Sequence, residues 1–354
     1  MSSPFTPAWS SHEANAVSLL PNPLVTSETL TAHAKALLKE RRLKDRAHTS
    51  REVLDVLAAQ EVGRPQSEAR RHNLERLAQG ALVVATGQQV GLFLGPLYAL
   101  HKAATAIAWA RELERRLEHP VVPLFWLQTE DADFDEVKTT WLPGSDGLQQ
   151  LTLEPGPTVD GRPLDVNARV SLGHRQIGPS IAAALDAARA ALSGPHAETT
   201  LALLERFYRP DRTLGEAAGE LMAELFADSG LLVFDPRPAR GPSPSETTPF
   251  KEALAFALNT HDRIEAALSD RAAALEQAGF DVQVKVRERT SLACHHPDGP
   301  CGDRYRLVRR PGTRWALSGH PGELDHEDAL DDTTRLSTTA LLRPLLQDRL
   351  FPTV

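Results

Sequence analysis

The sequence predicts an α/β fold with a parallel sheet, and three apolar segments carry that prediction. Residues 81–85, 121–127 and 231–236 are short, nearly continuous apolar runs, a pattern typical of strands covered on both faces. Helical patterns separate these runs, and strands that alternate with helices favour a parallel sheet. Each run ends at polar residues, and the carboxyl ends of parallel strands are where such proteins bind ligands.

The first 80 residues are predicted to be helical after an irregular start. Ser27 is placed to open a helix that runs to Lys39, and Ser50 and Ser67 are placed to cap two further helices, the last ending near Gly80. Serine favours these positions because its hydroxyl accepts a hydrogen bond from a backbone N–H that the helix leaves free.

A further helix is expected directly after Gly95. Pro96 would be its first residue, where the missing proline N–H costs no hydrogen bond. Tyr98, Lys102 and Thr105 are spaced by four and three residues, so they share one face of this helix. The apolar face is predicted to consist of Leu97, Leu100, Ala104, Ile107 and Ala108.

The chain is expected to divide into a core and two interruptions. Gly, Pro and polar residues are dense after Trp141, with short strands expected around Leu151 and Val170, whereas a capping-box spacing at Thr213 opens a helix to about residue 228. One long helix is predicted from residue 249 to 279. The segments are N-terminal helices with the first part of the core (1–138), a first insertion (139–205), core (206–280), a β-rich second insertion (281–335) and the start of a last core segment (336–354).

The loop after the first strand is the first candidate site. Its glycines allow close backbone approach, and the start of the following helix, with Lys102 one turn inside, would attract phosphate or carboxylate. The alternative is that the glycines only make a tight turn. The candidate binding residues are Thr86, Gly87, Gln88, Gln89, Gly95, Pro96 and Tyr98.

An acidic cluster after the second strand is the other candidate site. Five of the seven residues from 130 to 136 are carboxylates. Glu130, Asp131 and Asp133 are predicted to be functional, either with Mg²⁺ or as a base for a substrate ammonium, whereas Asp135 and Glu136 are expected at the surface. The alternative is that the later acids only open the next helix. Asp235 is a third polar residue at a strand end.

Composition excludes several classes of function. A net charge of −8 without a basic block argues against nucleic acid or a membrane surface as partner. We find no signal peptide and no apolar run of the roughly 20 residues that a membrane span needs, so a cytoplasmic location is expected. Cys294, His295, His296 and Cys301 do not have the spacing of a familiar zinc site, and we assign no metal ligands.

Several motifs together resemble the bacillithiol biosynthesis cysteine-adding enzyme family. They are Thr86-Gly87-Gln88-Gln89, Gly95-Pro96-Leu97-Tyr98 with Lys102, Phe125-Trp126, Glu130-Asp131 with Asp133-Phe134, Tyr208 with Arg212-Thr213, Leu231 to Pro236, Leu336-Ser337, Leu342-Arg343-Pro344 and Gln347-Asp348. The resemblance spans most of the chain. It implies a Rossmann-like core interrupted by two connecting segments and followed by a coiled coil that makes a homodimer.

The resemblance also implies a reaction, in which a ligase joins cysteine to the amine of glucosaminyl-malate in the last step of bacillithiol synthesis. Lys102 and the helix start would hold phosphate or the malyl carboxylates. The acidic cluster would hold the cysteine ammonium, the glucosamine amine or Mg²⁺, and Asp235 and Arg343 would complete the cleft. ATP, with Mg²⁺, is the candidate activating cosubstrate.

Three departures from the family pattern accompany the resemblance. Ala132 stands where the family usually has histidine, and Ser337-Thr338-Thr339 stands where it tends to read Ser-Pro-Asn. The chain ends at Val354, before the family's coiled coil. Two other functions therefore stay open: a metal-dependent nucleotide-sugar transferase, and a truncated remnant that binds ligand without turnover.

Overall fold

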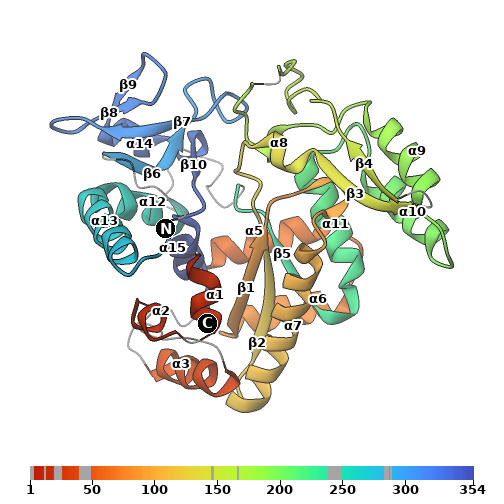
Figure 1. Ribbon diagram of the computed structural model, residues 1–354, viewed down its shortest axis with the longest axis horizontal. Coiled ribbons are helices and arrows are strands. Elements are labelled where there is room, and N and C mark those ends of the chain that lie inside the picture. The colour runs from red at the N-terminus through yellow and green to blue at the C-terminus, as the bar shows by residue number, and fades with distance from the viewer. Residues whose placement is uncertain are drawn as a thin grey trace.

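A computed structural model describes residues 4–11, 13–19, 26–39, 49–144, 147–165, 167–237, 249–282, 287 and 289–354 of the 354-residue chain. It contains a three-stranded sheet, a five-stranded sheet and a separate two-stranded hairpin. Figure 1 shows the three-stranded sheet low in the centre, with the five-stranded sheet and the hairpin above it on opposite sides. The α/β prediction is confirmed.

The three-stranded sheet consists of the predicted strands. Strands β1 (Leu82–Gln88), β2 (Val121–Leu127) and β5 (Leu232–Phe234) pair in parallel in the order β1-β2-β5. Strand β1 is longer than the apolar run that predicted it, because Thr86, Gly87 and Gln88 continue its pairing with β2. These three residues therefore belong to a strand and not to a loop.

Helices cover both faces of this sheet. Helices α7 (Tyr98–Leu117) and α11 (Leu214–Leu225) lie on one face, while α5 (Arg51–Val62), α12 (Pro249–Asn259) and α15 (Arg343–Leu350) lie on the other. A sheet covered on both faces must have strands that are apolar throughout, which is the pattern that predicted it.

The alternation of side chains along β2 assigns its residues to the two faces. Val122, Leu124 and Trp126 join the cluster that includes α5, α12 and α15. Phe125 and Leu127 join the cluster with α7 and α11. All five side chains are at most 2% exposed. Burial of this much apolar surface from one central strand is the main stabilisation of the core.

The N-terminal helices begin at the predicted serines. Ser50 accepts a hydrogen bond from Val53 N and caps α5, and Ser67 accepts one from Arg70 N and caps α6 (Glu68–Ala78). Helix α3 (Ser27–Lys39) has the predicted bounds. The irregular start that we expected is wrong in part, because α1 (Phe5–Ser10) and α2 (Ala14–Leu19) pack on Phe280.

Helix α7 starts later than predicted. Gly95 and Pro96 are joined by a cis peptide and Pro96 lies outside the helix, whose first residue is Tyr98. A short 3-10 helix, η1 (Leu92–Leu94), precedes it. The predicted apolar face is wrong except at Ile107 and the half-buried Leu100: the buried residues are Ala99, Ala103, Ala106, Ile107, Ala110 and Leu113. The shorter alanines lie against the sheet because they let the helix approach closely.

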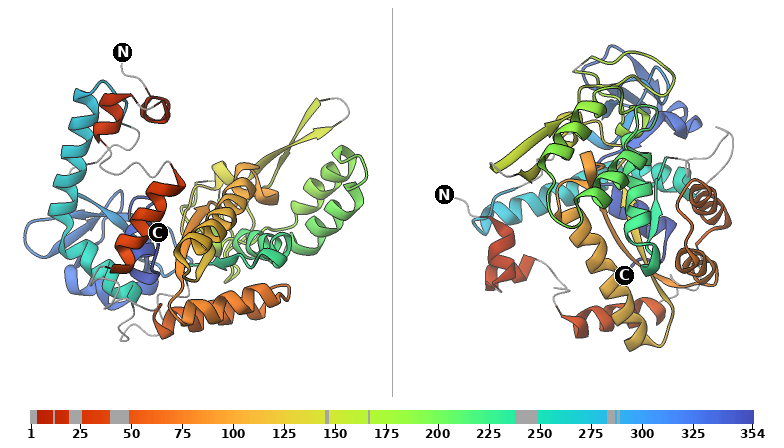
Figure 2. Two further views of the ribbon diagram at one scale, coloured as in Figure 1. Left: turned by 90° about the horizontal axis from the view of Figure 1, so that it is seen from below. Right: turned by 90° about the vertical axis from the view of Figure 1, so that its right-hand side faces the viewer.

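The segment from 139 to 205 forms a hairpin and two helices. Strands β3 (Thr139–Gly144) and β4 (Gly147–Thr152) pair antiparallel and project beyond the sheet, beside α9 (Ile181–Ala191) and α10 (Ala197–Phe207) (Figure 2). The strand expected around Leu151 is confirmed. The strand expected around Val170 is wrong, since that residue is in no strand.

The predicted long helix from 249 to 279 is two helices. Helix α12 ends at Asn259, Thr260 leaves the helical conformation with φ −106° and ψ 19°, and α13 (His261–Gln277) follows. The Thr260 hydroxyl donates to Phe256 O at 2.7 Å. A threonine hydroxyl that bonds the carbonyl oxygen four residues earlier competes with the backbone hydrogen bonds that would continue the helix.

The five-stranded sheet lies in the later part of the chain. Its order is β10-β6-β7-β8-β9, all antiparallel, and β10 (Leu336–Thr338) leads back to the core through α15. The expected boundary at residue 336 thus falls inside this sheet. Its other strands are β6 (Thr290–His295), β7 (Tyr305–Arg309), β8 (Arg314–Leu317) and β9 (Glu323–Asp325), with α14 (His326–Asp331) after β9.

The last residues of the chain return to the core sheet. Val83 N donates to Pro352 O, and Val354 N donates to Val83 O, both at 2.9 Å. Thr353 is thereby bridged in parallel to β1 on the side that β2 leaves open.

Candidate active site

Polar residues gather where the three parallel strands end. Strand β1 ends at Gln88, β2 ends before Gln128, and β5 ends before Asp235. Because the strands are parallel neighbours, these ends meet at one edge of the sheet. The candidate residues are therefore brought to one side of the molecule by the fold itself.

The glycines of the first loop are required by contacts within the protein. A Cβ on Gly87 would lie 2.5 Å from Trp126 O, and one on Gly95 would lie 2.5 Å from the Thr140 hydroxyl oxygen. A Cβ on Gly91 would overlap Gly95 O. The tight-turn interpretation accounts for all three positions without a ligand.

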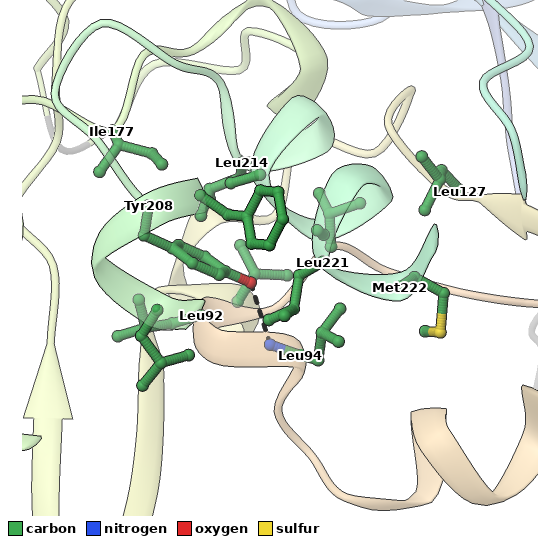
Figure 3. Close-up of a cluster of buried hydrophobic side chains, with 14 of the residues drawn as sticks. Leu92, Leu94, Leu127, Ile177, Tyr208, Leu214, Leu221 and Met222 are labelled. Carbon is green, nitrogen blue, oxygen red and sulfur yellow. Dashed lines mark hydrogen bonds between the residues drawn. The ribbon is translucent and has the colours of Figure 1, made fainter. Parts of the chain in front are cut away.

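The turn between β1 and α7 is strained, and Tyr208 holds it. Phe93 and Leu94 have φ values of 54° and 59°, in the left-handed region that costs a non-glycine residue about 1–3 kcal/mol. Leu94 N donates to the Tyr208 hydroxyl oxygen at 3.0 Å, as Figure 3 shows, and that hydroxyl lies 3.4 Å from Gly91 O. The buried ring also packs edge-to-face on Phe93, with centroids 4.9 Å apart.

The start of α7 is closed by its own backbone. Ala99 N donates to Pro96 O at 2.9 Å, and Leu100 N donates to Leu97 O at 3.0 Å. These two amides are therefore engaged within the backbone, and the anion site that we expected at this helix start stays a prediction.

Lys102 lies beside this helix start and contacts the end of β1. Its Nζ donates to Gln88 Oε1 at 2.8 Å and lies 5.2 Å from the centre of the Tyr98 ring. Gln88 Nε2 in turn donates to the Tyr98 hydroxyl oxygen at 3.0 Å. Burial and the positive charge of nearby Arg343 lower the pKa of Lys102.

Asp131 is the most connected carboxylate of the acidic cluster. Its Oδ1 accepts from Arg304 Nη2 at 2.8 Å, and its Oδ2 accepts from Gln89 Nε2 at 2.7 Å. The Arg304 and Asp131 side chains are only 18% and 22% exposed, so water screens this ion pair incompletely. Gln89 Nε2 also donates to Glu136 Oε2 at 2.7 Å, which ties the first loop to the acidic cluster.

The other acidic residues have different environments. Glu130 is 1% exposed and accepts a hydrogen bond from the Thr338 hydroxyl. Asp133 accepts from Glu136 N at 3.2 Å and caps the short helix α8 (Phe134–Val137). Asp135 pairs with Lys138 at 2.6 Å. The helix-opening interpretation therefore applies to Asp133 as well as to Asp135.

Arg304 and Arg343, from the later part of the chain, contact residues that follow strand β2. Arg304 Nη1 donates to Glu130 O at 2.6 Å, and Arg343 Nη1 donates to Gln128 Oε1 at 3.2 Å. Burial lowers the pKa of Arg343, and the negative charge of Asp131 opposes that shift. Sequence reasoning missed Arg304, which immediately precedes β7 and lies 173 residues from Asp131, and no local motif marks it.

A large cavity, which we call the arginine-rich cavity, opens between the acidic cluster and the five-stranded sheet. Its volume is about 690 Å³. Asp131, Asp133 and Asp135 line one part of it, and Gln128 and Thr338 line another. Four arginines also line it, Arg169, Arg287, Arg304 and Arg306.

A second cavity of about 370 Å³, the loop cavity, lies between the first loop and the hairpin. The predicted binding residues Gln88, Gln89, Gly95, Pro96 and Tyr98 line it together with the exposed Trp141. The structure thus places part of the predicted site in each of these two cavities, and the Gln89 side chain bridges a carboxylate of each.

Asp235 lines neither of these cavities. It is 9% exposed and accepts from the Thr129 hydroxyl at 2.7 Å and from Arg237 Nη2 at 2.5 Å. Burial acts to raise its pKa, but the charge and hydrogen bonds of Arg237 outweigh burial and lower it. Arg237 also donates to Gly173 O, and it helps burial to lower the pKa of neighbouring His174 to about 4. The Asp235 carboxylate therefore anchors Thr129 and Arg237, and its expected role in a cleft stays a prediction.

The described residues contain no group of three or more His, Cys, Asp and Glu side chains placed to hold a metal ion. Asp131 is engaged by Arg304 and Gln89, and Asp133 by a helix N-terminus, so these carboxylates do not converge on a common point. Cys294 lies on β6 and lines the arginine-rich cavity, whereas Cys301 lies in the following turn.

Comparison with known proteins decides the family. Residues 26–354 match the family described as "Bacillithiol biosynthesis BshC, N-terminal Rossmann-like domain". The chain belongs to this family. It is 31% identical over 336 residues to a protein of Koribacter versatilis and 33% identical over 310 residues to one of Solibacter usitatus, both named "Putative cysteine ligase BshC".

These alignments cover 93% and 84% of this chain, but only 57% and 52% of the two relatives. The chain thus spans about half the length of the curated relatives it matches. The BshC family match agrees with the resemblance drawn from the motifs. Among the described helices we find none with the length and hydrophobicity of a transmembrane segment.

Proposed function

We propose that this chain carries the substrate-joining site of a cysteine ligase, which adds cysteine to the amine of glucosaminyl-malate. The observation that supports this proposal best is the charge distribution in the arginine-rich cavity, whose lining combines Asp131 with four arginines. Both substrates carry an amino group and at least one carboxylate, so they require charges of both signs within one cavity.

The arginines suit the carboxylates. A guanidinium group can donate two parallel hydrogen bonds to a carboxylate, which gives geometric specificity as well as affinity. Arg304 already makes one such hydrogen bond, from Nη2 to Asp131 Oδ1 at 2.8 Å. In our proposal the malyl carboxylates bind to Arg169 and Arg304, which line the same cavity.

Asp131 suits the reacting amine. Its carboxylate is held from two sides by Arg304 and Gln89, which fixes its orientation in the cavity. A fixed carboxylate within reach of an amine can take the proton that nitrogen must lose when it forms an amide. Ala132 has no titratable group, so we assign the proton transfer to Asp131.

Joining a carboxylate to an amine requires activation, and we propose adenylate chemistry with ATP. The carboxylate oxygen of cysteine attacks the α-phosphorus, and pyrophosphate leaves. The amine nitrogen then attacks the acyl carbon, AMP leaves, and the nitrogen loses one proton to the carboxylate of Asp131. The net change is one amide formed, with ATP converted to AMP and pyrophosphate.

A mass-spectrometric assay tests the proposal. Glucosaminyl-malate, cysteine and ATP are incubated with this chain, and in parallel with the longer Koribacter versatilis relative. We expect the mass of the cysteine adduct in both, and its loss with Asp131→Asn. Asp135→Asn is the matched control, because Asp135 lines the same cavity but its carboxylate pairs with Lys138.

Other outcomes would support the alternative functions. Binding of both substrates without product, beside an active relative, would identify this chain as a non-catalytic remnant. Manganese-dependent binding of a sugar nucleotide, with no response to glucosaminyl-malate, would support a transferase. An Asp131→Asn variant as active as the parent chain would contradict the role of Asp131.

A further inference from the structure

A third cavity, which we call the apolar cavity, adjoins the arginine-rich cavity. It has a volume of about 200 Å³ and lies between helix α13 and strand β6. Its apolar lining comes from Ile264, Leu268, Leu292 and Leu341. Glu265 is the acidic residue of its lining, and both of its carboxylate oxygens lie 3.0 Å from Arg289 N.

The two cavities share one wall. Arg287, Arg306, Thr339 and Ala340 line both of them. Within the described part of the chain, neither Arg287 nor Arg306 forms an ion pair with a carboxylate, and the hydroxyl of Thr339 has no hydrogen-bond partner. The shared wall therefore presents two guanidinium groups and a hydroxyl donor that the described residues leave available to a ligand.

From this arrangement we infer that the apolar cavity and the shared wall form a nucleotide site. The apolar cavity would take the base, and Arg287, Arg306 and Thr339 would bind the phosphates. This assignment uses both halves of the site: an inorganic anion would leave the apolar cavity empty, and an apolar ligand would leave the arginines without a partner. It rests on the proposed function for the choice of a nucleotide among ligands that combine a ring with an anionic group.

The position of the shared wall places the phosphates next to the proposed reaction. Arg306 lines the arginine-rich cavity together with Asp131 and Arg304. Phosphates bound at the wall would therefore face the cavity in which the cysteine carboxylate is activated. At the start of α7 the amides of Ala99 and Leu100 donate to the backbone and are not available to a phosphate. Phosphate recognition by arginine side chains replaces recognition by a glycine-rich loop in this assignment.

Calorimetric titration of this chain with three probes tests the inference. The probes are ATP, adenosine and inorganic triphosphate, so that the base and the phosphates are measured separately. Arg306→Gln should weaken ATP and triphosphate binding about tenfold and leave adenosine unchanged, since a charge-assisted hydrogen bond is lost. Arg310→Gln is the matched control, because Arg310 lies four residues along the chain and lines neither cavity.

Filling the apolar cavity should weaken binding of the two probes that carry the base and spare the probe that has only phosphates. Ile264→Trp, or Leu268→Trp as a second variant, should weaken ATP and adenosine about tenfold and leave triphosphate unchanged. Ala267→Trp is the control, because Ala267 is exposed on the same helix and does not line the cavity. Circular dichroism confirms that each variant is folded before its affinity is compared.

Three results would overturn the inference: no ATP binding by the parent chain, ATP binding that these variants leave unchanged, or equal losses for all three probes in a folded variant. None of these results depends on turnover. If the chain adds cysteine while its nucleotide binding ignores Arg306 and Ile264, the proposed function stands and the nucleotide site is wrong.

Discussion

Replacing Tyr208 by phenylalanine isolates the hydroxyl that holds the strained turn. The substitution keeps the ring, and with it the edge-to-face contact with Phe93 at 4.9 Å. It removes one of the two acceptors of Leu94 N, the hydroxyl oxygen at 3.0 Å, and leaves Gly91 O at 3.1 Å. Leu94 is 6% exposed and Tyr208 is fully buried, so water cannot readily replace the lost partner.

The expected magnitude follows from that burial. Because Leu94 N keeps Gly91 O as an acceptor, the variant loses one hydrogen bond, worth about 0.5–1.5 kcal/mol, and leaves no donor unsatisfied. The left-handed residues Phe93 and Leu94 store strain of the same order, about 1–3 kcal/mol each, which the hydrogen bond helps to offset. We therefore expect Tyr208→Phe to lower the free energy of unfolding by about 0.5–1.5 kcal/mol.

Urea unfolding followed by circular dichroism measures this change. Tyr305→Phe is the matched control, because Tyr305 is half-buried on β7 and its hydroxyl has no hydrogen bond to another described residue. The control should change the free energy of unfolding by less than about 0.5 kcal/mol. Equal values for the two variants would refute the assignment of Tyr208 as the residue that holds the turn.

Three further predictions concern other contacts. Gly91→Ala should destabilise the fold by more than about 2 kcal/mol, whereas Gly63→Ala, where a Cβ meets nothing within 4 Å, should be close to neutral; similar unfolding free energies for the two would contradict the close-contact interpretation. The pKa of His174 is lowered to about 4 in the folded protein, so the unfolded chain binds a proton more readily. The free energy of unfolding should therefore fall as pH drops from 6.5 to 4, and His174→Gln should reduce this dependence on pH, measured as urea midpoints. Arg304→Gln should weaken glucosaminyl-malate binding about tenfold in calorimetry, while Arg310→Gln leaves it unchanged. Equal affinities of the two variants would contradict a role of Arg304 in binding this substrate.

Local physics made much of the fold predictable. The strands of the core are apolar on both faces, so their pattern is visible without any knowledge of their partners. The caps at Ser50, Ser67 and Thr213 were equally visible, because a hydroxyl at a helix start bonds a backbone N–H only two or three residues away.

The start of α7 shows where such reasoning fails. Proline is common at first helical positions, which is why Pro96 was placed there. In the structure the chain turns back through Gly91 and Gly95 before the helix begins. That turn depends on Tyr208, more than a hundred residues further along the chain. A local preference was overridden by a distant contact that no short window of sequence contains.

The candidate site was predictable in its location but less so in its members. Strand ends indicated Asp131 and Gln89, since polar residues after parallel strands meet at one edge. The same rule also selected Asp235, whose carboxylate is occupied by Arg237, a residue that the pattern did not weigh. Arg304 was missed because its position depends on the pairing of a separate sheet.

The contact between Arg304 and Asp131 has a consequence for how the site comes into being during synthesis. The two residues are 173 positions apart, so a ribosome must add nearly half of the chain after Asp131 before its partner exists. Contacts this distant in sequence form late, since a long loop must close before they stabilise anything. Strand β2, which precedes Asp131, can therefore fold early, while the charge arrangement around Asp131 is assembled only when the segment that carries Arg304 has docked.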